Sequence, residues 1–161
     1  MTTPFPDGTI YSFEPNTPHF IYSNFYPHSV SFEGITFPSN EHAYQAAKSL
    51  DEDIRRMIMR CGSAATAKKL GRTIQIRPNW NEIKLQIMYD LLKQKFSNEG
   101  LGRQLWTTGD REIIEGNYWH DVYWGKCFCP KHNWEGQNFL GRLIKKVRLE
   151  LDGWRHWNAS V

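Results

Sequence analysis

The chain has 161 residues, 40% hydrophobic and 23% charged, which is enough for one domain that buries its own core. Its formal net charge of +3 is too small to indicate a nucleic-acid-binding protein by itself, although it suits a phosphorylated substrate. Neither a run of about 18 apolar residues nor a basic and then apolar N-terminus occurs, so we expect no membrane association and an intracellular protein, cytoplasmic or, in a eukaryote, also nuclear.

The first predicted elements are an irregular arm and a β-hairpin. The prolines within residues 1–20 predict an N-terminal arm, in which residues 10–13 can add an edge strand, and we assign residues 21–161 to one domain. Residues 30–37 alternate in polarity around Glu33-Gly34, which predicts a hairpin.

A helix is predicted next, with Ser39 as its cap. At about 100° per residue, one face of this helix carries polar and aromatic side chains, namely Glu41, Tyr44, Gln45 and Lys48. Three alanines and Leu50 fall on the opposite face, so we expect that face to pack and the polar face to be exposed. The polar face is then either ordinary solvated surface or a site for chemistry.

The rest of the chain is predicted to be mainly helical. Helices are expected over residues 51–60, 63–70, 79–96 and 100–106, the third of them capped by Asn79, and a strand over residues 112–115. Apolar residues from Leu140 to Leu151 recur at helical spacing and predict a terminal amphipathic helix. These elements indicate an α+β fold, a mostly helical single domain with a small antiparallel β-sheet.

Four motifs occur in order between about residues 20 and 152. They are Tyr22-Ser23-Asn24-Phe25, the segment from Pro38 to His42 that continues to Gln45 and Lys48, Tyr123-Trp124-Gly125, and Gly136-Gln137-Asn138-Phe139-Leu140-Gly141. With these motifs the chain resembles the NADAR family, also called YbiA-like. That resemblance implies the YbiA-like fold and an N-glycosidase, a hydrolase of N-glycosidic bonds, because some members cleave early riboflavin-pathway intermediates and others remove ADP-ribose from guanine bases.

Cleavage of an N-glycosidic bond needs a carboxylate near the anomeric carbon and an acid near the departing nitrogen. Glu41 matches the family motif and is the first candidate, and Asp121 is the second, because it is a lone acid among aromatic residues. The alternatives are a surface glutamate near a helix N-terminus and a polar edge residue of a strand. Lys48, on the family's Gln-Ala-x-Lys position, is a candidate nucleophile through a Schiff base or else a phosphate-binding cation.

The candidate substrate-binding residues combine aromatic, amide and basic side chains. Trp119 and Trp124 can stack on a planar base, while Arg72 and Asn24 can contact phosphate and ribose. Backbone N–H groups from Gly136 to Gly141 are a further candidate phosphate cradle. The full set is Asn24, Phe25, Tyr44, Gln45, Arg72, Trp119, Tyr123, Trp124 and Asn138.

Residues 126–135 depart from the glycine-rich sequence that is usual in this family and suggest a substrate-specific loop. They include Cys127-Phe128-Cys129-Pro130-Lys131-His132. The Cys-x-Cys spacing is shorter than in a zinc knuckle and no second Cys/His pair follows, so we predict reduced thiols, no metal and no cofactor. The odd number of cysteines, three, also argues against a secreted disulfide framework.

The leading functional prediction is hydrolysis of the ribose–nitrogen bond of ADP-ribosylated guanine, in a nucleic acid or a nucleotide. The expected partner is therefore an ADP-ribose-containing or other phosphorylated ribosyl substrate, including ADP-ribosylated DNA or RNA. Two alternatives use the same residues: hydrolysis of the phosphoribosylamino-pyrimidine intermediates of riboflavin synthesis, and a non-catalytic module that binds ADP-ribose or NAD.

Overall fold

The structure, a computed structural model, describes the backbone of residues 3–158 and the side chains of residues 3–151. It comprises two compact units. The unit from Asn24 to Asn98 contains β1 (Pro27–Phe32), β2 (Ile35–Ser39), α1 (Asn40–Ala47), α2 (Glu52–Met59), α3 (Ala64–Gly71) and α4 (Trp80–Ser97). The other unit, made of the residues up to Ser23 and those from Glu99, contains η1 (Phe20–Tyr22), α5 (Glu99–Thr107), β3 (Gly116–Asn117), β4 (Lys126–Cys127) and α6 (Phe139–Asn158).

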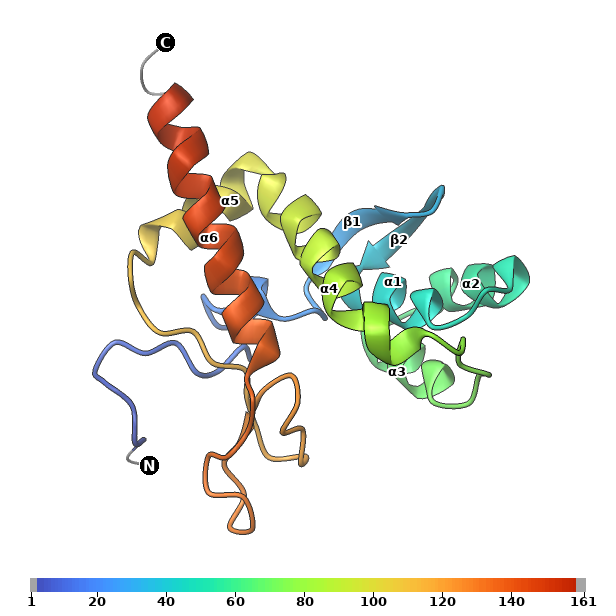
Figure 1. Cartoon of the computed structure of the whole chain (residues 1–161), viewed down its shortest axis with the longest axis horizontal. Coiled ribbons are helices and arrows are strands. Elements are labelled where there is room, and N and C mark those ends of the chain that lie inside the picture. Colours follow the sequence, from blue (N-terminus) through green and yellow to red (C-terminus); the bar gives the residue numbers. More distant parts are fainter. Residues whose placement is uncertain (1–2, 159–161) are drawn as a thin grey trace. The chain divides into compact units, whose positions relative to one another are not determined.

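The predicted hairpin is confirmed as the antiparallel pair β1 and β2, which Figure 1 shows beside α1 and α4. Val30 pairs with Phe37, and Phe32 pairs with Ile35 across the turn. Glu33 and Gly34 both have positive φ, 43° and 83°, as a two-residue turn of the I′ kind requires. The glycine takes the second of these positions without steric cost.

Helix α1 lies at the centre of its unit and contacts both strands and α2, α3 and α4. Its cap is confirmed, because the Ser39 side chain accepts a hydrogen bond from the His42 N–H at 3.2 Å. All eight of its residues are buried, including those of the polar face. The expectation that the polar face is exposed is therefore wrong. The expectation that Leu50 packs with the alanines is also wrong, because Leu50 lies beyond the helix and is 66% exposed.

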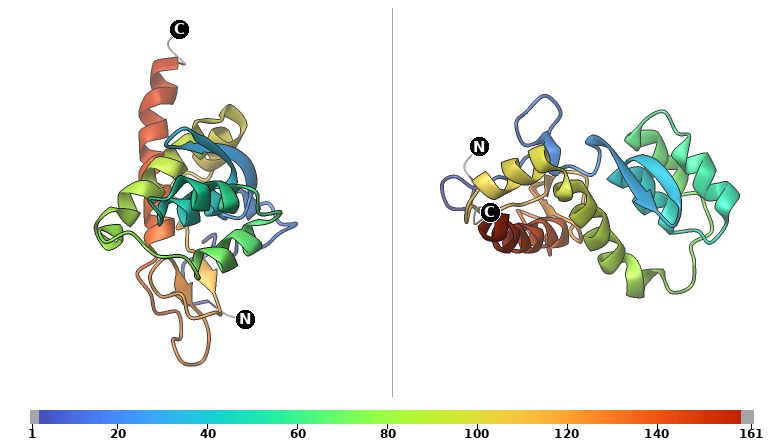
Figure 2. Two further views of the ribbon diagram at one scale, coloured as in Figure 1. Left: turned by 90° about the vertical axis from the view of Figure 1, so that its right-hand side faces the viewer. Right: turned by 90° about the horizontal axis from the view of Figure 1, so that it is seen from above.

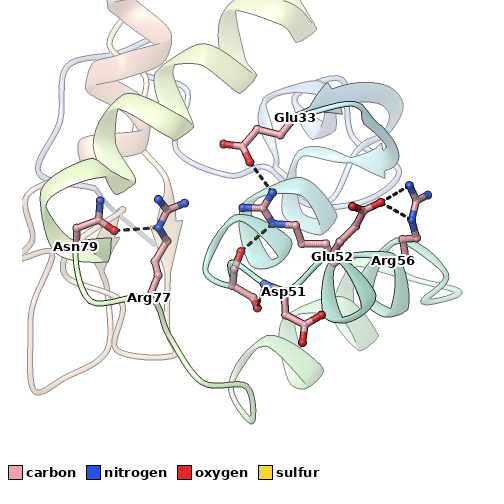
Figure 3. A network of polar contacts seen from close by, with 8 residues as sticks. Glu33, Asp51, Glu52, Arg56, Arg77 and Asn79 are labelled. Carbon is pink, nitrogen blue, oxygen red and sulfur yellow. Dashed lines mark hydrogen bonds and ion pairs between the residues drawn. The ribbon is translucent and has the colours of Figure 1, made fainter.

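The other helices of this unit follow the predicted positions with one difference in capping. Asp51 and Ser63 cap α2 and α3 through their side chains. Helix α4 begins after Asn79, but that side chain makes no cap bond; its Oδ1 accepts instead from Arg77 Nε at 2.9 Å (Figure 3). The helix start was thus predicted correctly, but the cap was not.

A lysine is among the charged side chains buried in this unit, and it lies next to Tyr26 and Phe96. Lys95 is 1% exposed, and its Nζ lies 5.2 Å from the centroid of the Tyr26 ring and 5.6 Å from that of Phe96. Burial lowers the pKa of Lys95 to about 7.

In the second unit, the strand predicted at residues 112–115 is reduced to a bridge. The Ile10 N–H donates to the Glu112 carbonyl at 2.8 Å, and the Ile114 N–H donates to the Ile10 carbonyl at 2.7 Å, so residues 10 and 113 form an isolated parallel bridge. The predicted arm is held to this unit by these bonds, and the boundary at residue 20 stays a prediction. Strands β3 and β4, two short orange arrows in Figure 2, pair in parallel.

The predicted fold class is confirmed: a mostly helical α+β chain with a small antiparallel sheet. The predicted terminal helix is α6, whose apolar stripe buries Leu140, Ile144 and Val147. Within the described residues, every helix is too short or too polar to span a membrane.

Candidate active site

Glu41 begins α1 as a buried carboxylate, only 6% exposed. Gln45, one turn later, donates its side-chain N–H to Glu41 Oε1 at 2.8 Å, and the Glu41 backbone N–H donates to the Asn24 carbonyl at 3.0 Å. Burial raises the pKa of Glu41, while the Gln45 hydrogen bond and nearby positive charges oppose that rise. A carboxyl with a raised pKa suits proton transfer near neutrality.

Lys48 is the C-cap of the same helix and is half-buried. Its Nζ lies 5.6 Å from the centroid of the Tyr44 ring. Burial lowers the pKa of Lys48, the Glu41 charge opposes this, and three further cations lower it again: Arg72, Lys68 and Lys84. An amine in such surroundings loses its proton more readily than a surface lysine does, as a nucleophile must.

Aromatic rings lie next to the charged groups of this region. Tyr44 packs against Trp80, with ring centroids 5.1 Å apart, and Lys68 Nζ lies 5.8 Å from the centroid of the Phe25 ring. The sequence predicted Tyr44, Phe25 and Arg72 here but missed Lys68 and Trp80. The spacing of Lys68 and Arg72, four residues apart at the end of α3, would have placed both on one face.

Two buried oxygens in this region lack hydrogen-bond partners among the described residues, namely Asn24 Oδ1 and Gln45 Oε1. A buried polar atom without a partner costs about 1–3 kcal/mol, so such atoms at a polar site point to a ligand that donates hydrogen bonds. Both residues were predicted to bind substrate. The hydroxyl groups of a ribose are donors of the required kind.

Gly71 allows α3 to pack directly against Gln45. A Cβ at residue 71 would lie 2.0 Å from Gln45 Oε1 and 3.0 Å from its Cβ. Because residue 71 has no side chain, the Gln45 amide can occupy this space. Helix α3 can then end at Arg72 close to α1. We call Asn24, Glu41, Gln45, Lys48, Lys68 and Arg72 the α1 site.

Comparison with known proteins places this chain in a family. The NADAR domain model matches residues 11–152. The chain belongs to the NADAR family. It is similar to the N-glycosidase YbiA of Escherichia coli, with 35% identity over 133 residues, 81% of this chain and 80% of that protein. The solved NMR structure of E. coli YbiA matches with a TM-score of 0.76 and 31% identity, covering 94% of this chain and 89% of that one.

A further relative is a longer protein. The riboflavin biosynthesis protein VVA0006 of Vibrio vulnificus is 37% identical over 145 residues, which are 88% of this chain. This chain spans only 38% of that protein's length. The resemblance predicted from four motifs is thus confirmed at the level of the family and the fold.

Asp121, in the other unit of this NADAR chain, forms a turn. Its Oδ1 accepts hydrogen bonds from the N–H groups of Tyr123 and Trp124, at 3.0 and 2.8 Å. Asn117 brackets the same turn by accepting from the Asp121 N–H at 3.1 Å and donating to its carbonyl at 2.7 Å. This geometry is that of an aspartate stabilising an Asx turn, and the catalytic role remains a prediction.

The predicted base-stacking residues of this NADAR chain differ in exposure. Trp119 is 46% exposed, next to Tyr118 at 61%. Tyr123 and Trp124 are half-buried and contact one another edge to face, with centroids 4.9 Å apart, and Tyr123 also packs on Phe139 at 4.8 Å. Trp119 thus has the more accessible ring.

Asn138 uses both ends of its amide on the backbone. Its Nδ2 donates to the Ile113 carbonyl at 2.9 Å, and its Oδ1 accepts from the Glu115 N–H at 3.0 Å. The N–H groups of residues 137–140 donate to the carbonyls of residues 122–125. The expected phosphate cradle between Gly136 and Gly141 is therefore wrong for these four N–H groups, because they already have acceptors.

Proposed function

We propose that this chain is an N-glycosidase that hydrolyses the ribose–nitrogen bond of a phosphorylated N-riboside at the α1 site, with ADP-ribosylated guanine as its first candidate substrate. The observation that carries the proposal is the buried Glu41 and half-buried Lys48 on one helix, with pKa values moved toward each other. A carboxyl and an amine in that state can exchange protons with a substrate near neutrality.

The proposed reaction uses Lys48 as the nucleophile. The ribosyl ring opens to an imine, the Lys48 amine adds to C1′, and the C1′–nitrogen bond breaks as the departing amine takes a proton from Glu41. Water then adds to the Schiff base, returns a proton to Glu41, and releases the sugar aldehyde, which closes to ribose. The balanced result is one water consumed, one free amine and one free ribosyl group. In the alternative route, Glu41 activates water for direct attack on C1′.

Substrate recognition is assigned to the remaining residues of the α1 site. Lys68 and Arg72 supply positive charge for a phosphate, and the unpartnered oxygens of Asn24 and Gln45 accept from ribose hydroxyls. Both candidate substrates carry a 5′-phosphorylated ribose, so this recognition suits either one.

A second substrate is favoured by a specific observation. The Vibrio vulnificus relative is named a riboflavin biosynthesis protein, which favours a phosphoribosylamino-pyrimidine as this second substrate.

A different observation favours the first candidate, ADP-ribosylated guanine in a nucleic acid. The rings of Tyr118 and Trp119 are exposed, and exposed aromatic side chains stack on unpaired bases. A module that only binds ADP-ribose or NAD has no need of the desolvated Glu41 and Lys48.

The test offers three molecules to the full chain: an ADP-ribosylated guanine oligonucleotide, a phosphoribosylamino-pyrimidine, and ADP-ribose itself. We expect release of the free base or amine from one of the first two. Glu41→Gln should lower that rate by about 10²-fold or more, whereas Glu82→Gln, an exposed glutamate in the first turn of α4, should not. Binding of ADP-ribose without turnover of either riboside would support the non-catalytic module.

A further inference from the structure

Four metal-ligating side chains converge in the unit that contains β3 and β4. They are His120, Cys127, Cys129 and His132, which we call the Cys/His cluster, and their ligand atoms all lie within 4.8 Å of one another. Cys129 Sγ lies 3.1 Å from His132 Nδ1 and 3.4 Å from His120 Nδ1, and the two Nδ1 atoms are 3.4 Å apart. All three cysteines of the chain are free thiols.

These separations are close to those around one tetrahedral zinc ion. With Zn–S bonds of about 2.3 Å and Zn–N bonds of about 2.0–2.1 Å, neighbouring ligand atoms in a tetrahedron are roughly 3.3–3.8 Å apart. Two thiolates with two imidazoles are a common structural zinc set, whereas Mg²⁺ and Ca²⁺ prefer oxygen ligands. The donor types therefore favour zinc, and the short separations allow one shared ion.

The backbone around the Cys/His cluster holds the ligands in place. The His132 and Asn133 N–H groups both donate to the Cys129 carbonyl, at 3.1 and 2.9 Å, which closes a tight turn between two ligands. Cys127 is fully buried and is fixed on both sides, because its N–H donates to the Glu135 carbonyl and its carbonyl accepts from the Trp134 N–H.

His120 completes the cluster from a separate turn. It has a φ of 70°, a left-handed conformation that is uncommon for residues other than glycine, and its ring lies near that of His132, with centroids 5.3 Å apart. The two Nδ1 atoms and the Cys129 sulfur lie within 3.4 Å of one another, so one cation can accept a lone pair from each of them.

We propose that His120, Cys127, Cys129 and His132 bind one Zn²⁺ ion as a structural site. Four protein ligands fill a tetrahedron, so the site has no open position for a substrate, and binding releases the two thiol protons to solvent. The ion would join the turn at His120 to the loop after β4. Because Asp121 follows His120, zinc would also fix the start of the Asp121 turn.

The first experiment measures metal in the full chain, purified without a metal-affinity tag, by inductively coupled plasma mass spectrometry. We expect one zinc per chain in the wild type and less than about a tenth of that in Cys129→Ser and in His120→Asn. His120 is exposed and asparagine tolerates positive φ, so the second variant should fold even if the first does not. Cys61→Ser, a free cysteine outside the cluster, should keep its zinc.

The second experiment replaces the ion by titrating the metal-free wild-type chain with Co²⁺. Tetrahedral ligation by two thiolates should give intense visible d–d bands and a sulfur-to-cobalt charge-transfer band, both saturating at one equivalent and both reversed by Zn²⁺. Wild-type protein that binds neither metal at micromolar concentration would overturn the proposal. Equal zinc content in the wild type and in folded His120→Asn would also overturn it.

Discussion

Gln45 donates its amide N–H to the Glu41 carboxylate at 2.8 Å, and both side chains are buried within α1. Any residue larger than glycine at position 71 would clash with the Gln45 side chain, so the position of this hydrogen bond depends on a residue of another helix, α3. The orientation of the candidate catalytic carboxyl is thus determined by the packing of α3 on α1.

The first prediction concerns this packing. Gly71→Ala places a Cβ 2.0 Å from Gln45 Oε1, so Gln45 must move and its bond to Glu41 must weaken. We expect activity to fall about tenfold or more, because small displacements of catalytic groups have large effects on rate. Gly62→Ala is the matched control, since no atom lies within 4 Å of its added Cβ. Equal rates in the two variants, measured on the substrate that is turned over, would contradict this.

The second prediction concerns Lys48. Incubation with substrate and a borohydride reductant should reduce the Schiff base and leave a sugar adduct on the peptide that contains Lys48, located by mass spectrometry. Lys48→Arg should give no adduct and lose about 10²-fold in rate, because a guanidinium stays protonated. Lys69→Arg, an exposed lysine of α3, serves as control. An active Lys48→Arg without any trapped adduct would favour direct attack by water.

The third prediction separates two roles of Asp121. Asp121→Asn keeps the Oδ1 acceptor for the N–H groups of Tyr123 and Trp124, while Asp121→Ala removes it. If the turn is its role, we expect near wild-type activity in Asp121→Asn and a loss of about 1–2 kcal/mol of stability in Asp121→Ala. The measurements are initial rates and urea unfolding. A folded Asp121→Asn slowed by about a hundredfold would instead support the catalytic role predicted from the sequence.

The fourth prediction concerns pH and Lys95. Its pKa is about 7 in the folded chain and about 10.4 in an unfolded one, so between these values the unfolded state binds more protons. The unfolding free energy should therefore rise with pH across this range, by at most about 1.4 kcal/mol per pH unit from this group.

Urea unfolding between pH 7.5 and 9.5 tests this expectation. The Lys95→Met variant should lose most of that rise, while Lys93→Met, an exposed lysine of the same helix, should keep it. The pKa of His28, beside Lys95, is lowered below 6.5 mainly by burial, so its titration falls outside the tested window. Parallel pH curves for the wild type and Lys95→Met would contradict the assignment.

The local elements were predictable where a short segment determines its own conformation. Ser39 as a cap, the Glu33-Gly34 turn and the apolar stripe of α6 each depend on a few neighbouring residues. The failures have a common cause in contacts that are distant in sequence. The polar face of α1 is buried because α2, α3, α4 and the hairpin surround that helix, and residues 112–115 form a bridge with Ile10 rather than a longer strand.

The candidate site shows the same division. Glu41, Gln45 and Lys48 were found because they share one helix and one motif, whereas Lys68 and Trp80 reach the site only through tertiary packing. The Cys/His cluster was not predicted, because His132 follows the two cysteines but no second Cys/His pair comes after it in the sequence. His120 lies seven residues before Cys127, on a separate turn whose position depends on the fold.

The enclosure of α1 also bears on how its amide hydrogens exchange with solvent. Since neighbouring elements cover every residue of this helix, no partial opening exposes its backbone without first separating those neighbours. Its amides should exchange only when the whole unit unfolds. The Glu41 carboxyl is likewise desolvated when the unit folds, so a substrate bound as proposed would meet it already desolvated and already aligned.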